Sequence, residues 1–400
     1  MTTKLRGITI GVLFLLSGFV LYAQQSGESR SLPPQCFKQS GPRQKAMPGL
    51  CKPALSSAQQ LSRELPRNDD SATYVSFDVP GATNGTTTTG INDGGTTTGY
   101  AIDAEDNYHG FLRDRAGNIT SFDVPGDGGG TLPYAVNNAG TTTGYWCTDL
   151  TFDVCPAFVR DRNGSIVSFD VPGDVVGPLP NAIGQDGTVI GTYFDVNNIG
   201  HGFVRARDGS LTTFDPAGSA WTRPWTISAD GTIAGAFVDA NGWHGFLRNR
   251  NGNISTFDVP GYRNTGEGAF FGGPALSMNP EGEIASSYLQ TSNVYDGFLR
   301  HRDGTFDTFF AADYPPCCIW SFPTALNADG TIAGYLNDGY DLNRGFVRTR
   351  DGNVTLFDVP GAGTGDFQGT VVIGMTAGHV IAGFYTDDGG INHGFLRIPH

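Results

Sequence analysis

Residues 200–215 read GHGFVRARDGSLTTFD, and close copies of this stretch recur through most of the chain. The Phe near its end, usually followed by Asp, returns every 43 to 52 residues. A repeat of this length indicates a fold built from stacked or ring-forming units, so we weigh the period before local patterns. Copies of this landmark lie at Phe77, Phe122, Phe169, Phe214, Phe257, Phe309 and Phe357.

A second landmark, usually Gly-Phe-Leu/Val-Arg, precedes the first by eleven residues in six copies. A third is a turn such as Asp186-Gly187-Thr188, followed by an alternating strand. In one copy we expect strands over 181–183, 188–194, 202–205 and 210–215. Four antiparallel strands in about 47 residues match one blade of a β-propeller. The Phe of the second landmark stands at Phe111, Phe158, Phe203, Phe246, Phe298, Phe346 and Phe395.

The turn between the two landmarks contains Asn-Gly or Asp-Gly in most copies, as at Asp208-Gly209. These pairs favour two-residue type I′ hairpins, in which both turn residues have positive φ. Such a turn predicts that Phe203 and Phe214 lie directly opposite each other, and likewise in the other copies. We expect these rings to pack between blades.

The two ends of the repeat region complete each other. It opens with an unpaired landmark strand, Tyr74 to Val79, and ends with the strand Gly394 to Arg397. Pairing the first strand with the last closes a ring and removes two exposed sheet edges. The sequence therefore predicts an all-β, seven-bladed β-propeller of four-stranded antiparallel blades over residues 73–400, closed by the N-terminal strand in the last blade.

The N-terminus resembles a secretory signal, with Lys4 and Arg6 before an apolar stretch from Ile8 to Tyr22. We expect residues 1–23 to be a signal peptide cleaved after Ala23, and an uncleaved anchor is the alternative. Residues 24–72 lack periodicity and are predicted to be a flexible linker. The protein is therefore expected outside the cell or in the periplasm, without a membrane span after cleavage, as a monomer.

The formal net charge of −14 argues against nucleic acid or anionic lipid as partners, because both require clustered Lys and Arg. The cysteines fit an exported protein. Cys147 and Cys155 are placed to close a hairpin loop, and Cys36 and Cys51 flank a short segment. The adjacent pair Cys317-Cys318 would form a strained bridge, so free thiols or other pairings stay open.

Groups that recur in every unit are expected to be structural, because a catalytic group is needed only once. His precedes Gly-Phe in four units, at His109, His201, His244 and His393. We expect hydrogen bonds from these imidazoles to turns rather than a metal site, and a capping role for the Asp after the landmark Phe. The repeated Arg is expected along a blade face with its stem buried. No cofactor is predicted, although the acidic loops around Asp103, Asp195, Asp239 and Asp387 leave Ca²⁺ open.

Function is expected where the repetition breaks. The loops that precede the inner strands of the fourth, fifth and sixth blades are longer and aromatic. All of them emerge on one face of a propeller, and aromatic side chains beside polar groups suit sugars or apolar ligands. The alternative is that these side chains form local cores. The predicted ligand-binding residues are Trp221, Arg223, Trp225, Tyr262, Phe271, Tyr314 and Trp320.

Glu267 and Asp313 lie in the same loops and are the candidate carboxylate pair if the protein cleaves glycosidic bonds. The chain contains no serine elbow, phosphate loop, zinc signature or nucleotide-binding fingerprint. We therefore favour a non-enzymatic binding or scaffold protein, whose partner is an extracellular glycan or an envelope protein. A propeller hydrolase or lyase acting on polysaccharide or a small molecule is the alternative.

The His-Gly-Phe-Leu-Arg and Asp-Gly-Thr-Ile-Ala-Gly-Tyr units resemble the HAF-type repeats of secreted bacterial proteins, over residues 73–400. The pattern departs at Pro156, Asp296 and Arg344, where His is expected. The resemblance implies export and a repeat fold, and it implies no reaction or catalytic residue. A looser similarity links the chain to streptogramin-lyase-like and NHL-type propellers, whose catalytic positions find no match here.

Overall fold

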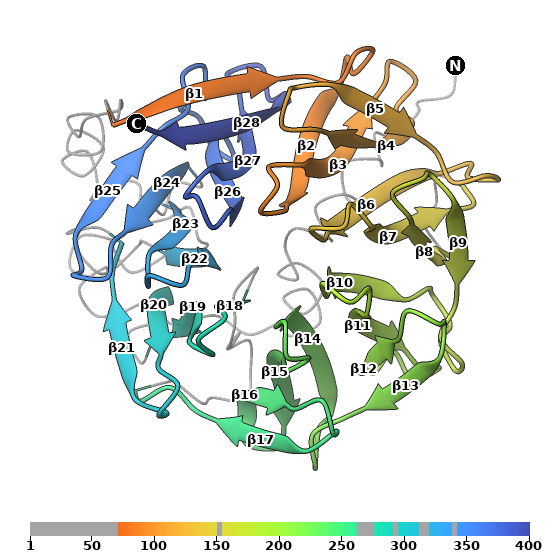
Figure 1. Ribbon diagram of the computed structural model, residues 1–400, viewed down its shortest axis with the longest axis vertical. Helices are drawn as coiled ribbons and strands as arrows, with labels where there is room; N and C mark the ends of the chain where they lie inside the picture. The colour runs from red at the N-terminus through yellow and green to blue at the C-terminus, as the bar shows by residue number, and fades with distance from the viewer. Residues whose placement is uncertain (1–70, 150–153, 262–275, 291–294, 312–319, 338–341) are drawn as a thin grey trace, which may run out of the picture.

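A computed structural model describes residues 71–149, 154–261, 276–290, 295–311, 320–337 and 342–400. The predicted signal peptide and nearly all of the predicted linker lie outside these residues. Seven blades, each of four antiparallel strands, surround a common centre (Figure 1). The predicted seven-bladed propeller is therefore confirmed. Within the described residues, no helix is long and apolar enough to cross a membrane.

We name the four strands of each blade a, b, c and d, from the centre of the ring outward. Blades 1 to 3 consist of β2 (Gly85–Ile91), β3 (Thr97–Ile102), β4 (Tyr108–Arg113), β5 (Ile119–Phe122), β6 (Gly130–Val136), β7 (Thr142–Cys147), β8 (Ala157–Arg160), β9 (Ile166–Phe169), β10 (Leu179–Ile183), β11 (Val189–Phe194), β12 (Gly200–Arg205) and β13 (Leu211–Phe214). Blades 4 and 5 consist of β14 (Trp221–Ile227), β15 (Ile233–Asp239), β16 (Gly242–Arg248), β17 (Ile254–Phe257), β18 (Ser277–Met278), β19 (Ile284–Leu289), β20 (Tyr295–Arg300) and β21 (Phe306–Phe309). Blades 6 and 7 consist of β22 (Trp320–Leu326), β23 (Ile332–Asn337), β24 (Asn343–Arg348), β25 (Val354–Phe357), β26 (Gly369–Met375), β27 (Ile381–Thr386), β28 (Asn392–Pro399) and β1 (Ala72–Phe77).

The ring closes as expected, because β1 pairs antiparallel with β28 and forms the outer strand of blade 7. Figure 1 shows the first and last strands side by side, with β2, β6, β10, β14, β18, β22 and β26 nearest the centre. Neighbouring inner strands contact one another around the whole ring. Blades 6 and 7 are also joined by one parallel bridge, between Asn343 and Gly369.

The c–d hairpin differs from its prediction by one residue. In blade 3, Phe214 lies opposite Gly202, and Phe203 lies opposite Thr213. The loop has three residues rather than two, because the pair that closes it is Ala206 and Ser210. Only its last residue, Gly209, has a positive φ, of 92°. This is the type I turn with a glycine bulge, the next most common hairpin after the two-residue types.

The glycine opposite each landmark Phe explains this register. A Cβ added at Gly245 would lie 2.4 Å from the ring of Phe257, and one at Gly394 would lie 2.4 Å from Phe77. The ring of the outer strand therefore lies flat on a position without a side chain. Blade 2 has the smallest alternative, Ala157, opposite Phe169.

Each landmark Phe also joins its blade to the next one. Phe169 of blade 2 meets Phe203 of blade 3 edge to face, with centroids 6.1 Å apart. The guanidinium of Arg205, two residues beyond Phe203, lies 4.8 Å from the same Phe169 ring. We call this contact of Phe with Phe and Arg the blade joint. Its guanidinium–ring half recurs with Arg113, Arg160, Arg205, Arg248, Arg300, Arg348 and Arg397.

Side chains of the a–b turns add a second connection between blades, nearer the centre. Asn92 donates its amide to the backbone carbonyl of Asn137 at 2.8 Å, and Asn137 donates to that of Gly184 at 3.0 Å. Asn279 donates to Asn327 in the same way, at 3.1 Å. Each amide satisfies a buried carbonyl of the next blade, which fixes the angle between blades.

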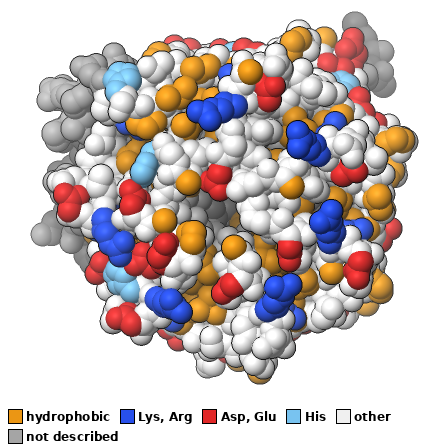
Figure 2. Space-filling view, viewed as in Figure 1, with side chains coloured by type: hydrophobic (Ala, Val, Ile, Leu, Met, Phe, Trp, Pro, Cys, Tyr) orange, Lys and Arg blue, Asp and Glu red, His pale blue; other side chains and the backbone are white. Residues whose placement is uncertain are grey.

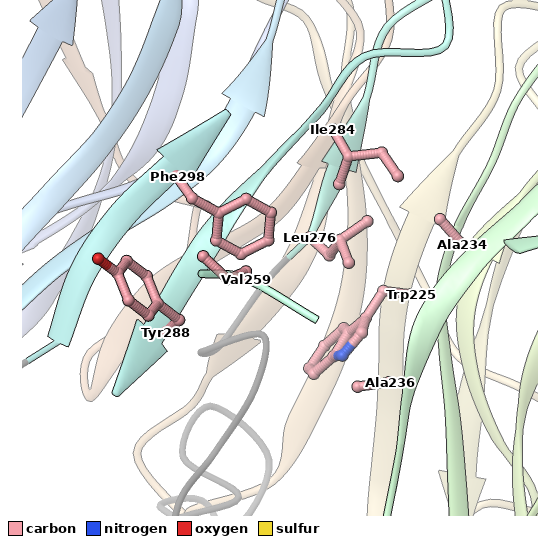
Figure 3. Packing of buried hydrophobic residues seen from close by; sticks show 8 residues of the cluster. All are labelled: Trp225, Ala234, Ala236, Val259, Leu276, Ile284, Tyr288 and Phe298. Atoms are coloured by element: carbon pink, nitrogen blue, oxygen red, sulfur yellow. The ribbon is translucent and has the colours of Figure 1, made fainter. Parts of the chain in front are cut away.

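The hydrophobic core is divided into layers between neighbouring blades. The layer between blades 4 and 5 contains Trp225, Val259, Leu276, Ile284 and Phe298, all less than a tenth exposed (Figure 3). The predicted disulfide between Cys147 and Cys155 is present, and it closes the b–c loop of blade 2. The other four cysteines lie outside the described residues.

The blade joint generates a test on two arginines of one hairpin. Arg205→Met keeps an apolar stem but removes the cation from Phe169, so we expect a loss of about 1 kcal/mol in the free energy of unfolding. Arg207, two residues on, is exposed and forms no ion pair among the described residues. Arg207→Met should change stability by less than about 0.5 kcal/mol. Chemical denaturation measures the free energy of unfolding of both variants. Equal losses of stability would contradict a contribution from the contact between the guanidinium and the Phe169 ring.

Candidate functional site

The face of the ring that bears the b–c and d–a loops carries the recurring histidines. His109 lies between two carboxylates, with Nδ1 2.9 Å from Asp123 and Nε2 3.2 Å from Asp103. Asp123 follows the landmark Phe, and Asp103 begins the b–c loop. The predicted hydrogen bond to a turn is therefore a contact with Asp side chains, and the Asp after the landmark Phe is a histidine partner rather than only a turn cap.

The same Asp-His-Asp clamp recurs in three other blades. His201 lies between Asp215 and Asp195, His244 between Asp258 and Asp239, and His393 between Asp78 and Asp387. In His109, where both ring nitrogens lie within hydrogen-bond distance of a carboxylate, this geometry favours the doubly protonated ring. The clamps tie each b–c loop to the outer strand.

The clamp also occupies the groups that a metal would need. Asp103 accepts hydrogen bonds from the backbone N–H groups of Glu105 and Asn107 as well as from His109. These bonds, led by those from Asn107, lower the pKa of Asp103 to about 2. No group of three or more potential metal ligands occurs among the described residues. Ca²⁺ in these loops stays a prediction without structural support.

Blades 5 and 6 replace the clamp. Arg344 occupies the histidine position in blade 6 and contacts both oxygens of Asp358, at 3.1 and 2.9 Å. In blade 5 that position is Asp296, and the partner Asp is replaced by the exposed Phe310. Asp296 is 1% exposed, and its Oδ1 has no hydrogen-bond partner within the described structure. Its Oδ2 accepts from Gln290. Burial raises the pKa of Asp296 to about 7.

The inner strands of blades 4 and 6 begin with tryptophan. The equivalent first positions of blades 1, 2 and 7 are Gly85, Gly130 and Gly369, all with positive φ. Trp221 and Trp320 are only half-buried. Each meets a second aromatic ring at a steep angle. Trp221 packs on Trp243 at 5.1 Å and Trp320 on Tyr295 at 5.6 Å.

Three predicted ligand-binding residues lie inside strand β14 rather than in a loop. Trp225 is 9% exposed, and its indole packs against Ala236 and Leu276 in the core between blades 4 and 5 (Figure 3). The local-core alternative therefore holds for Trp225. Arg223 is half-buried, and its guanidinium lies 3.9 Å from the centroid of the Trp225 ring.

Arg223 and two tyrosines from different blades influence one another electrostatically. Arg223 on β14 interacts electrostatically with Tyr134 on β6, and Tyr134 interacts with Tyr335 on β23. All three side chains are half-buried. Burial lowers the pKa of Arg223 and raises those of both tyrosines. Figure 2 shows one face of the ring, on which Lys or Arg and acidic side chains are interspersed around the centre.

Of the predicted site residues, Tyr262, Phe271 and Tyr314 lie outside the described residues, as do Glu267 and Asp313. Sequence reasoning did not select Tyr134, Tyr335 or Asp296 as site residues. The available signal was alignment of the repeats, since Asp296 stands where other blades have His. Tyr134 lies at the irregular position of its inner strand, which the period alone does not mark.

The clamp at His109 predicts a specific pH dependence. Although burial alone would lower it, hydrogen bonds to Asp123 and then to Asp103 raise the pKa of His109 above 6.5. The clamp therefore stabilises the fold fully below pH 6.5 and loses this contribution as the pH rises through the folded-state pKa. We expect about 0.5 kcal/mol, because the imidazole is partly exposed. An NMR titration measures the pKa of His109 in the folded protein. A value at or below 6.5 would contradict the charged clamp.

Asp296 predicts the opposite pH dependence to a normal carboxylate. Its pKa is raised from 3.8 to about 7, so stability falls as the pH rises from about 4 to 7, while the unfolded chain ionises first. Asp296→Asn removes this penalty, and we expect it to gain about 1–3 kcal/mol relative to the wild type between pH 5 and pH 8. Denaturation at the two pH values measures the gain. A difference that does not change with pH would show that Asp296 ionises normally.

Comparison with known proteins supports the fold. No protein-family model matches the chain, and no curated protein matches it by sequence. Virginiamycin B lyase from Staphylococcus aureus, solved as a catalytically inactive form with quinupristin, is similar in structure, with a TM-score of 0.54 and 12% identity over 82% of this chain and 99% of that one. AofleA from Arthrobotrys oligospora (TM-score 0.40, 13% identity, 72% and 82% covered) and puromycin hydrolase (0.46, 13%, 81% and 56%) are less similar. The likeness to virginiamycin B lyase agrees with a β-propeller fold, and the resemblance to HAF-type repeats stays a prediction.

Proposed function

We propose that this protein is an exported, non-enzymatic binding protein that takes a glycan on the face of the b–c and d–a loops, beside blades 4 to 6. The observation that carries the proposal is the replacement of glycine by Trp221 and Trp320 at the start of two inner strands. A half-buried tryptophan offers an apolar surface on which a sugar ring can stack. Two of them on one face provide two separate stacking surfaces.

Charge and repetition support this proposal. The clamps recur within four blades, and the blade joints and Asn contacts recur between blades, so they account for stability rather than for recognition. The tryptophans belong to the part of the face that breaks the repeat. All four lysines precede residue 53, so the blades lack the cationic clusters that nucleic acid requires.

Asp296 favours a second candidate, a hydrolase or lyase. A buried carboxyl with a pKa of about 7 and one unpartnered oxygen is typical of a proton-transfer group. It lies in blade 5, between the two tryptophan-bearing blades. The same measurement separates the two candidates, since an enzyme releases product and a binding protein does not.

A polysaccharide panel tests the proposed function. The purified full chain is incubated with soluble and insoluble polysaccharides, and retained protein and released sugar are scored together. We expect retention without release, reduced at least tenfold by Trp320→Ala and by Trp221→Ala, because each loses a stacking surface worth about 1–2 kcal/mol. Trp146→Ala is the matched control, since Trp146 is half-buried on blade 2 and donates to Ser168 at 3.0 Å.

Other outcomes redirect the interpretation. Release of sugar that is lost in Asp296→Asn would replace binding by catalysis. Neither retention nor release would remove the glycan and leave an envelope protein as the partner. Trp225→Ala is not used, because Trp225 belongs to the core. Its removal is expected to destabilise the packing between blades 4 and 5.

A further inference from the structure

Arg223 differs from every other arginine that the structure describes. Seven arginines complete blade joints, Arg344 pairs with Asp358, and Arg350 pairs with Glu283. The remaining five are exposed on c–d turns, at Arg115, Arg162, Arg207, Arg250 and Arg302. Arg223 alone among them lies on an inner strand, β14, where its guanidinium stacks on the ring of Trp225.

The repeat shows that the fold does not need a charge at this position. The residues equivalent to Arg223, two before the irregular position of each inner strand, are uncharged in the other blades that can be aligned. They are Thr87, Leu132, Leu179, Phe322 and Val371. Opposite Arg223 lies the small Ala236, whereas Leu132 and Phe322 lie opposite Tyr145 and Tyr335. Blade 4 therefore has a cation opposite a small residue, where these two blades have a pair of large side chains.

The surroundings of Arg223 leave its hydrogen-bond donors available. No carboxylate forms an ion pair with it among the described residues, and the nearest group on one side is the ring of Trp225, at 3.9 Å. A half-buried guanidinium loses much of its hydration, and an indole face compensates only part of that loss. Burial lowers the pKa of Arg223, yet a guanidinium stays charged at any physiological pH. An incoming anion would satisfy both the charge and the donors.

We propose that Arg223 binds the carboxylate of an acidic sugar at the centre of the ring, so that the natural ligand is a uronic-acid-containing glycan. The proposal rests on the glycan-binding function proposed above and adds the charge of the ligand. The planar guanidinium matches a carboxylate through two parallel hydrogen bonds.

The kind of anion follows from the number of cations. One guanidinium neutralises one charge, whereas a polyphosphate backbone would need a row of them. The tryptophans at the start of β14 and β22 provide the apolar surface that a sugar ring uses and that free phosphate does not. A single carboxylate on a sugar ring matches both features.

Binding of glucuronate by the purified full chain tests the proposal, with glucose as the neutral counterpart. By isothermal titration, glucuronate should bind at least tenfold more tightly than glucose. Arg223→Gln should lose at least tenfold in glucuronate affinity, and Arg223→Lys should fall between, since it keeps the charge but not the paired donors. Arg207→Gln removes an exposed arginine from blade 3 and should bind as the wild type does. Circular dichroism and thermal unfolding establish that each variant is folded.

Two results would overturn the proposal: equal binding of glucuronate and glucose, or equal glucuronate binding by the wild type and Arg223→Gln. The panel with polygalacturonate and its carboxyl-reduced form separates this failure from failure of the proposed function. If both polymers are retained equally through Trp320, glycan binding stands and the anion site is wrong. If neither polymer is retained but glucuronate binds through Arg223, the anion site stands and polysaccharide binding is wrong.

Discussion

The structure depends on the flat contact between the landmark Phe of an outer strand and the glycine opposite it. This contact leaves the other face of the ring free to meet the next blade, where a Phe edge and a guanidinium cover it. Because a Cβ at Gly245 or Gly394 would come within 2.4 Å of the ring, the glycine, the Phe and the hairpin register depend on one another. The same unit closes the circle, where Phe77 from the N-terminal strand receives Phe111 and Arg113 of blade 1.

A joint of this kind separates stability from recognition. Aromatic and arginine side chains, which are the usual residues of binding sites, are used here in most blades for packing. An exposed Trp or an unpaired Arg is therefore informative only where it departs from the repeat. Trp221, Trp320, Arg223 and Asp296 meet that condition, and Trp225 does not, because its ring fills the layer between two blades. The departures cluster in blades 4 to 6, where joints on either side hold the sheets in place.

The period of the landmarks was enough to predict the fold and the closure by β1. The hairpin register was missed, because an Asn-Gly or Asp-Gly pair favours two kinds of turn, and the eleven-residue spacing fits both. The small residue before each second Phe was the signal that distinguishes them. The contacts of His109 with Asp103 and Asp123 join residues from separate loops, which a linear pattern does not bring together. Likewise, Tyr134 and Arg223 influence each other only because the ring brings blades 2 and 4 around one centre.

The overall negative charge of the chain does not oppose an anionic ligand at Arg223. Eight carboxylates of the loop-bearing face lie in clamps, at the b–c loops and the outer strand ends, and each lies beside an imidazole. Those groups lie two or three strands from the centre, and interactions between exposed charges weaken within about 8 Å at physiological salt. Arg223 lies on the innermost strand, where the residues equivalent to it in the other blades carry no charge. The electrostatic potential that a ligand meets near the innermost strand is therefore set by the Arg223 guanidinium more than by the carboxylates of the clamps. Those carboxylates disfavour the binding of anions elsewhere on this face.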